Sequence, residues 1–166
     1  VAEAVGPAEQ LAWRCGAAGQ DTRTVPLGEL REQLAALAVD VTERLAGAVR
    51  RPVAVVLYAA DAADTALGRD GTDALRKVLR FGPETGVHVL GWWRGVQRLR
   101  ALLSISASVD DLGAWVGLDV QGAELQGLVP GMLISWSPRP GRGLFFDRAQ
   151  HAVPEVVIVP SLEEPP

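Results

Sequence analysis

The stretch Val53-Ala54-Val55-Val56-Leu57-Tyr58 is a continuous apolar run with β-branched residues in its middle, and Val87-His88-Val89-Leu90 is a second run of the same kind. Continuous rather than alternating apolar runs are typical of parallel strands that are buried on both faces. Between the two runs, Thr72 or Asp73 can cap a helix that ends at Gly82-Pro83. The order strand, helix, strand therefore predicts a parallel pair joined by a helical crossover.

The segments on either side continue this α/β pattern. Apolar residues recur every three or four positions from Leu27 to Leu45, which predicts an amphipathic helix. Weaker patterns predict a helix over 9–15, a strand over 22–25, a helix from Val96 to Leu103, a strand over 114–120, a hairpin that joins 132–136 to 144–146, and a last strand over 156–159. We therefore expect one α/β domain over residues 1–160, with a mostly parallel sheet and a C-terminal antiparallel hairpin, and a tail at 161–166.

The composition is that of a folded, acidic protein. The chain has 166 residues, of which 48% are apolar, and this is enough for a core. A net charge of −4 argues against nucleic-acid binding through bulk charge. The single cysteine, Cys15, excludes an internal disulfide and a multi-cysteine zinc site. No apolar run approaches the roughly 18 residues of a membrane helix, and no secretory signal opens the sequence, so we expect a cytoplasmic protein without a membrane segment.

The sequence encodes no phosphate cradle. A P-loop needs the pattern G-x-x-x-x-G-K-[ST], because its lysine must reach the β- and γ-phosphates. The only lysine, Lys77, lies inside a predicted helix with no glycine before it, and Gly-x-Gly-x-x-Gly is also absent. We therefore expect this chain to hold no nucleotide cofactor by itself.

Side chains suited to covalent or acid–base catalysis are few. Cys15 is expected to be an ordinary small apolar residue, and His88, in the middle of a strand, a hydrogen-bonded structural histidine. Asp110-Asp111 is expected to shape a turn. Asp61 follows the first strand directly, at the edge where α/β proteins build their sites, so it is a candidate binding residue; a structural role in the loop is the alternative.

Two short segments combine arginine with aromatic or proline residues. Trp92-Trp93-Arg94 follows the second strand, and two adjacent large aromatic side chains cannot both point into one core. Trp92 and Trp93 could stack on a base while Arg94 grips a phosphate, or they could form a packing or interface patch. Arg139, Arg142 and Arg148 form a second basic spot, which is either a basic contact, with nucleic acid as a candidate partner, or a solvated hairpin turn.

The order of these motifs resembles the C-terminal half of an FtsK/SpoIIIE-type motor ATPase, particularly the versions found in actinobacteria. The stretches that carry the resemblance are Gly86 to Arg94, Val129-Pro130-Gly131 and Pro140 to Asp147, and it covers roughly residues 22 to 160. It implies a RecA-like sheet, a homo-oligomeric ring that moves DNA or polypeptide, and ATP and Mg²⁺ in the intact protein. It also implies that Arg94 reaches a nucleotide held by a neighbouring subunit.

The chain departs from this family at the nucleotide site. Family members end the first strand in Asp-Glu, which holds Mg²⁺ and activates water, whereas Leu57 and Tyr58 stand at those places here. The family's sensor threonine and glutamine fall near Trp92 and Trp93, and the P-loop strand that lies centrally in the family's sheet is missing. We expect rearrangement, another chain or an upstream segment to close the resulting gap.

Two functions follow. The chain begins at Val1 and its only methionine is Met132, so we expect a fragment or a processed product. The first function is a piece of a ring ATPase that hydrolyses no ATP alone and supplies ring contacts and Arg94. The alternative, favoured by Leu57 and Tyr58, is a non-catalytic pseudo-ATPase that acts as an assembly or regulatory module.

Overall fold

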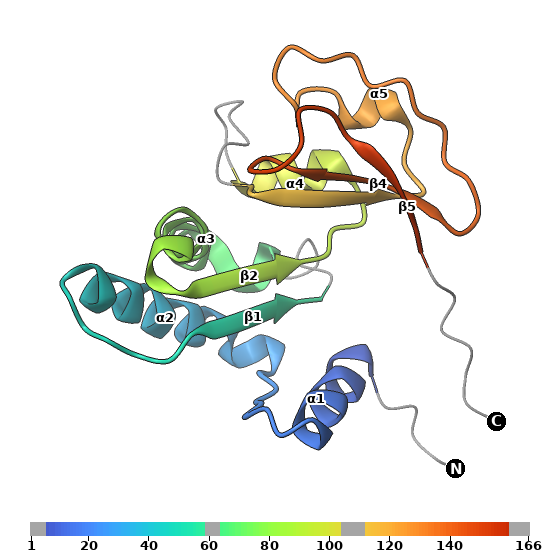
Figure 1. Cartoon of the computed structure of the whole chain (residues 1–166). Coiled ribbons are helices and arrows are strands. Elements are labelled where there is room, and N and C mark those ends of the chain that lie inside the picture. The colour runs from blue at the N-terminus through green and yellow to red at the C-terminus, as the bar shows by residue number, and fades with distance from the viewer. Residues whose placement is uncertain (1–5, 59–63, 104–111, 160–166) are drawn as a thin grey trace. The chain divides into compact units, whose positions relative to one another are not determined.

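The computed structural model describes residues 6–58, 64–103 and 112–159, and Figure 1 shows the path of the chain. The chain divides into two compact units, one ending at Arg94 and the other beginning at Gly95. The structure confirms a mixed α/β protein, with a two-stranded parallel sheet in the first unit and a separate three-stranded antiparallel sheet in the second. Asp61, Asp110 and Asp111 and the tail at 161–166 lie outside the described residues.

The first unit is a strand–helix–strand motif preceded by helices. Its elements are α1 (Pro7–Ala17), η1 (Leu27–Glu29), α2 (Leu30–Leu45), β1 (Val53–Leu57), α3 (Asp64–Phe81), η3 (Pro83–Thr85) and β2 (Val87–Gly91). Strand β1 pairs in parallel with β2, from Val53 opposite Val87 to Leu57 opposite Gly91. The predicted parallel pair is therefore confirmed, whereas the strand predicted over 22–25 is not formed.

Helix α3 begins earlier than the sequence indicates. It starts at Asp64 instead of at the predicted cap, Thr72 or Asp73, and it contains a break at Gly68, whose φ of 58° is left-handed. Glycine tolerates this conformation because it has no Cβ. The hydroxyl of Thr72 donates to the carbonyl oxygen of Gly68 at 2.7 Å, so Thr72 lies in the first turn after the break.

The core of the first unit lies between the two long helices and one face of the sheet. Val41 from α2, Val78 from α3 and Val87 from β2 are completely buried, and they form one cluster with Ala38. Burial of side chains of this size stabilises the fold by roughly 1.5–3 kcal/mol each. Packing against α2 and α3 on this face therefore holds the sheet in position (Figure 1).

The opposite face of the parallel sheet is not covered, which corrects the prediction that both faces are buried. Val56 and Leu90 lie opposite each other in register, and their side chains are 43% and 61% exposed. Successive side chains of a strand point to opposite faces. The described part of the unit packs helices on only one of them, so alternate residues of each apolar run reach the surface.

The second unit consists of α4 (Val96–Leu103), β3 (Ala114–Leu118), α5 (Gly122–Leu125), β4 (Arg142–Asp147) and β5 (Glu155–Ile158). Strand β4 is central and pairs antiparallel with both β3 and β5. The sequence placed the strand over 114–120 in the parallel sheet, and this placement is wrong. The hairpin of 132–136 with 144–146 is also wrong, because 132–136 forms no strand.

The segment at 132–136 packs over the sheet of the second unit instead of joining it. Ile134 is buried with Leu125, Leu144 and Phe146 in one apolar cluster. The Gly122 amide donates to the carbonyl oxygen of Trp136 at 2.9 Å, which fixes the segment beside the start of α5. The apolar residues of 132–136, which made this segment resemble a strand in the sequence, therefore pack against the core of the second unit.

Candidate functional site

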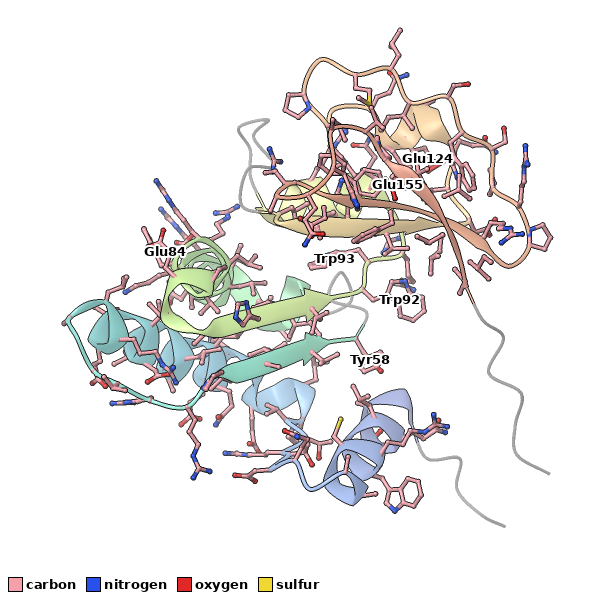
Figure 2. All side chains as sticks on the ribbon, in the orientation of Figure 1. Tyr58, Glu84, Trp92, Trp93, Glu124 and Glu155 are labelled. Carbon is pink, nitrogen blue, oxygen red and sulfur yellow. The ribbon has the colours of Figure 1, made fainter. Side chains whose placement is uncertain are left out.

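The carboxyl ends of β1 and β2 carry the residues that the sequence analysis singled out in the first unit. Beyond the last paired residues of the sheet, the Trp92 amide donates to the carbonyl oxygen of Leu57 at 2.9 Å. This hydrogen bond continues the parallel ladder, so Tyr58 and Trp92 follow the ends of neighbouring strands (Figure 2). The side chains of Tyr58 and Trp92 are 39% and 58% exposed.

The two adjacent tryptophans have different environments, as expected from their sequence. Trp92 is exposed, whereas Trp93 is half-buried. The six-membered ring of Trp93 occupies the space that a side chain at position 91 would need, so Gly91 lets the indole lie against the backbone. The Nε1 atom of Trp93 is buried and has no hydrogen-bond partner among the residues that the structure describes. An unsatisfied donor of this kind costs about 1–3 kcal/mol.

Arg94 is exposed at the bend that follows β2, within the first unit. The carboxyl ends of parallel strands are where open α/β sheets place their ligands. The structure therefore brings Trp92, Trp93 and Arg94 to one end of the parallel pair. Asp61, the third cofactor-binding candidate besides the two tryptophans, lies outside the described residues.

The described residues at this end of the sheet do not fit a magnesium nucleotide. Mg²⁺ in nucleotide sites is bound through carboxylates and phosphate oxygens. Leu57 has a buried aliphatic side chain and Tyr58 a phenol, and neither can replace a carboxylate pair. Among the residues that the structure describes, no three His, Cys, Asp or Glu side chains gather as a metal-binding group.

An exposed apolar surface runs along the uncovered side of the parallel sheet. It consists of alternate residues of the two strands and of the positions just beyond them, and we call it the open face: Ala54, Val56, Tyr58, His88, Leu90 and Trp92. The face carries no Asp, Glu, Lys or Arg. Its one imidazole, His88, is exposed and forms no hydrogen bond with another described residue, so the prediction of a hydrogen-bonded structural histidine is wrong. In the described residues the sheet has two strands, so each strand also has an edge without a strand partner.

Two arginines of the second basic spot, Arg139 and Arg142, lie together in the second unit, whereas the third, Arg148, does not line their site and donates to the carbonyl oxygen of Leu112 at 3.3 Å. Both line an open pocket of about 320 Å³ at the end of the antiparallel sheet. Its other lining residues come from the end of β3, the loop before β4 and the residue after β5: Leu118, Asp119, Pro138, Pro140, Gly141 and Val159. The structure thus places the two arginines in one site, separate from the open face of the first unit.

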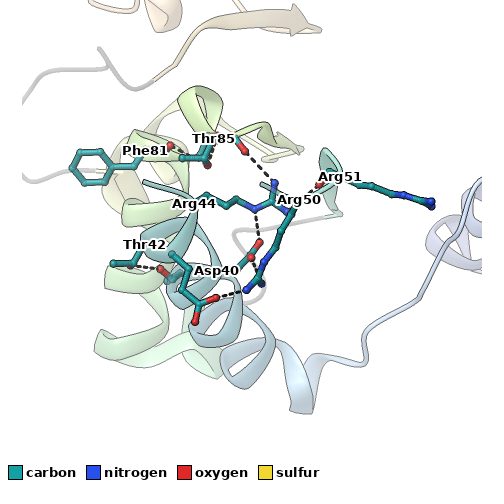
Figure 3. A network of polar contacts seen from close by, with 10 residues as sticks. Asp40, Thr42, Arg44, Arg50, Arg51, Phe81 and Thr85 are labelled. Atoms are coloured by element: carbon teal, nitrogen blue, oxygen red, sulfur yellow. Dashed lines mark hydrogen bonds and ion pairs between the residues drawn. The ribbon is translucent and has the colours of Figure 1, made fainter. Parts of the chain in front are cut away.

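A polar network that sequence reasoning missed holds the end of α2 (Figure 3). Arg44 donates to the Asp40 carboxylate at 2.7 Å, to the carbonyl oxygen of Thr85 at 3.1 Å and to that of Arg51 at 3.0 Å. Arg50 pairs with both Asp40 and Glu43. The only feature of the sequence that could have predicted this network is the i, i+4 spacing of Asp40 and Arg44, which is typical of an ion pair on one helix. The network ties α2 to the segments that precede β1 and β2, and its role is structural.

None of the helices within the described ranges is both long enough and apolar enough to cross a membrane. Comparisons of this chain with protein-family models, with curated proteins and with solved structures gave no match.

Proposed function

We propose that this chain is a non-catalytic interaction module built on one half of an FtsK/SpoIIIE-like motor scaffold. In this proposal the open face of the β1–β2 sheet docks onto the N-terminal half of such a motor or onto another protein chain of a cytoplasmic, homo-oligomeric assembly. The observation that carries the proposal is the apolar open face, in which Leu90 is 61% exposed.

The physical argument rests on how parallel sheets are stabilised. They occur almost only with both faces covered, and here α2 and α3 cover one face. Burial of a side chain such as Leu90 or Val56 on the open face would contribute roughly 1.5–3 kcal/mol. The unpartnered strand edges could accept further strands, which would complete a RecA-like sheet around β1 and β2.

The residues at the end of β1 support the non-catalytic part of the proposal. Leu57 and Tyr58 stand where the resembling family has its magnesium-binding and water-activating carboxylates. Any ATP and Mg²⁺ that the assembly uses would therefore be held by another chain.

A second candidate function is a ring motor that moves DNA or polypeptide, in which this chain acts on its neighbour's nucleotide. The observation that favours it is the exposed position of Arg94 at the carboxyl end of β2. An arginine supplied from a neighbouring subunit stabilises the charge that develops during phosphoryl transfer. This role is compatible with a chain that binds no nucleotide itself.

The test compares Leu90→Glu, on the open face, with Val49→Glu, which places the same charge at a residue that is 98% exposed outside that face. The tagged chain is purified with its partners from its native cells, and hydrogen exchange is followed in β1 and β2. We expect wild type and the Val49 variant to retain a partner that slows exchange in both strands, and the Leu90 variant to lose it. Equal recovery with all three chains would contradict docking at the open face.

A calorimetric titration of the isolated chain with ATP and Mg²⁺ tests the other half of the proposal. We expect no heat of binding. A Kd of about 1 μM, which corresponds to −8.2 kcal/mol, would show that the chain holds a nucleotide and would overturn its assignment as a non-catalytic module.

A further inference from the structure

The arginine-lined pocket of the second unit has an apolar floor, which consists of the aliphatic side chains of Leu118 and Val159. Gly143 of β4 lies under the side chains of its neighbours: a Cβ at this position would lie 2.8 Å from Leu118 Cδ2, 3.2 Å from Val116 Cγ1 and 3.4 Å from Val159 Cγ2. Three aliphatic side chains therefore converge over the glycine. Val116 and Leu118 are 51% and 49% exposed, although they belong to the same sheet as a buried core.

The rim of the pocket carries charges that have no partner within the described ranges. Neither the Arg139 nor the Arg142 guanidinium forms a hydrogen bond or an ion pair with another described residue, and the same is true of the Asp119 carboxylate. Asp119 also has a φ of 51°, the only positive φ at a non-glycine residue among those described. Such backbone outliers cluster at binding sites, where the surroundings hold them in place.

The loop that presents the arginines is constrained by its own sequence. Pro138 and Pro140 fix φ on either side of Arg139. The Arg142 amide donates to the carbonyl oxygen of Arg139 at 3.1 Å, and the Val159 amide donates to that of Gly141 at 3.0 Å. Little backbone entropy would therefore be lost when a ligand binds, because the loop is already ordered.

We propose that this pocket binds an acidic peptide segment of another protein, with a carboxylate on Arg139 and Arg142 and a neighbouring apolar side chain on the floor of Leu118 and Val159. Guanidinium groups bind carboxylates with paired, charge-assisted hydrogen bonds. The Asp119 carboxylate would accept a hydrogen bond from a peptide N–H or a basic side chain of the same segment.

The lining of the pocket favours a peptide over a nucleic acid. The Asp119 carboxylate can accept a hydrogen bond from a peptide N–H, a donor that a phosphate backbone lacks. The pocket walls are aliphatic and proline side chains, whereas proteins that bind single-stranded nucleic acid stack bases on aromatic side chains. A segment with one or two carboxylates and an aliphatic side chain matches both the rim and the floor.

This inference does not rest on the proposed function, because the pocket and the open face belong to different units. A variant of Leu90 can abolish docking at the open face and leave the pocket intact, and variants of the pocket can do the reverse. The two proposals therefore fail separately.

The experiment titrates the ¹⁵N-labelled chain with a short capped peptide in which a leucine lies between two glutamates, and with the same peptide carrying glutamines. We expect the glutamate peptide to shift the amide resonances of Asp119, Gly141 and Gly143. We expect Arg139→Ala/Arg142→Ala to weaken its binding at least tenfold. Two controls should bind the peptide like wild type. Arg69→Ala removes one exposed arginine of the first unit, and Arg31→Ala/Arg69→Ala removes the same charge as the test variant.

Three results would overturn the proposal. The first is equal binding of the glutamate and glutamine peptides, which would remove the carboxylate from the argument. The second is no binding of the glutamate peptide at about 1 mM, a free energy of only −4.1 kcal/mol. The third is binding of a phosphate in place of the peptide, lost in the same arginine variant. Tighter binding of an oligothymidylate would make the site one for nucleic acid, and equally tight binding of inorganic phosphate at matched ionic strength would show that a bare anion suffices without the apolar floor.

Discussion

Arg44 donates a hydrogen bond from Nε to the Asp40 carboxylate one helical turn earlier, at 2.7 Å, and the Arg44 side chain is only 5% exposed. Because the same guanidinium also donates to the carbonyl oxygens of Thr85 and Arg51, one side chain links α2 to the turn before β2 and to the segment before β1. The parallel motif is therefore held by a charged group as well as by its apolar core.

We predict that Arg44→Ala lowers the free energy of unfolding by about 3 kcal/mol. The substitution removes three hydrogen bonds: two carbonyl groups lose this donor, and the half-buried Asp40 carboxylate keeps only its pair with Arg50. Breaking a buried pair costs about 3–5 kcal/mol, and the remaining Arg50 pair places the expected loss at the lower end of this range. The Arg23–Glu29 pair is a matched control because both of its side chains are more than half exposed. Urea unfolding should show a loss below about 1 kcal/mol for Arg23→Ala; equal losses for both variants would contradict the role given to Arg44.

The open face predicts a contrast between two leucines. Leu75 in α3 is 1% exposed, whereas Leu90 in β2 is 61% exposed. Leu75→Ala should destabilise the isolated chain by about 2–5 kcal/mol, because it leaves a cavity in the core. Leu90→Ala should change stability by no more than about 0.5 kcal/mol. Chemical denaturation of both variants measures the difference, and a large loss for Leu90→Ala would show that its face is already covered.

The outcome of the sequence analysis differed between the two units for a physical reason. The apolar runs at Val53 and Val87 identified a parallel pair correctly, because a helix separates them and leaves one simple pairing. For the strand at Ala114, the apolar run gave no information about its partner, and the pairing with β4 depends on residues about thirty positions away. Local periodicity reports burial but not which strand lies alongside.

The candidate sites show the same limit. Trp92-Trp93-Arg94 and the Arg139 and Arg142 pair could be selected from the sequence because bulky and charged groups cluster there. Leu118, which lines the pocket, and Val116 beside it could not be selected, because exposed aliphatic residues of a strand look like core residues in the sequence. Their exposure depends on the absence of a side chain at Gly143 in the next strand, and on which face of the sheet other segments pack against.

Gly122 provides a test of the packing of the second unit. A Cβ at this position would overlap the carbonyl oxygen of Ile134 and would lie 2.7 Å from the Trp136 amide nitrogen. Gly122→Ala should therefore displace the segment at 132–136 and cost about 1–3 kcal/mol, as overpacking usually does. Gly113→Ala, where a Cβ meets nothing within 4 Å, is the control. Thermal unfolding should separate the two variants, and an unchanged midpoint for Gly122→Ala would contradict the close contact.

The last prediction concerns Arg94 and applies to the intact assembly. If Arg94 acts on a nucleotide held by the neighbouring subunit, Arg94→Ala should lower the rate of ATP hydrolysis by about 10³-fold or more, the range found for arginines supplied in trans. Nucleotide affinity should stay nearly unchanged, because such an arginine acts mainly on the transition state. Arg69→Ala, which removes an exposed arginine from α3 of the same unit, should leave both quantities unchanged. Steady-state hydrolysis and equilibrium binding of ATP, measured on the same preparations, distinguish a catalytic from a structural role of Arg94. If Arg94→Ala lowers the rate and the affinity in parallel, Arg94 stabilises the assembly and does not act in catalysis.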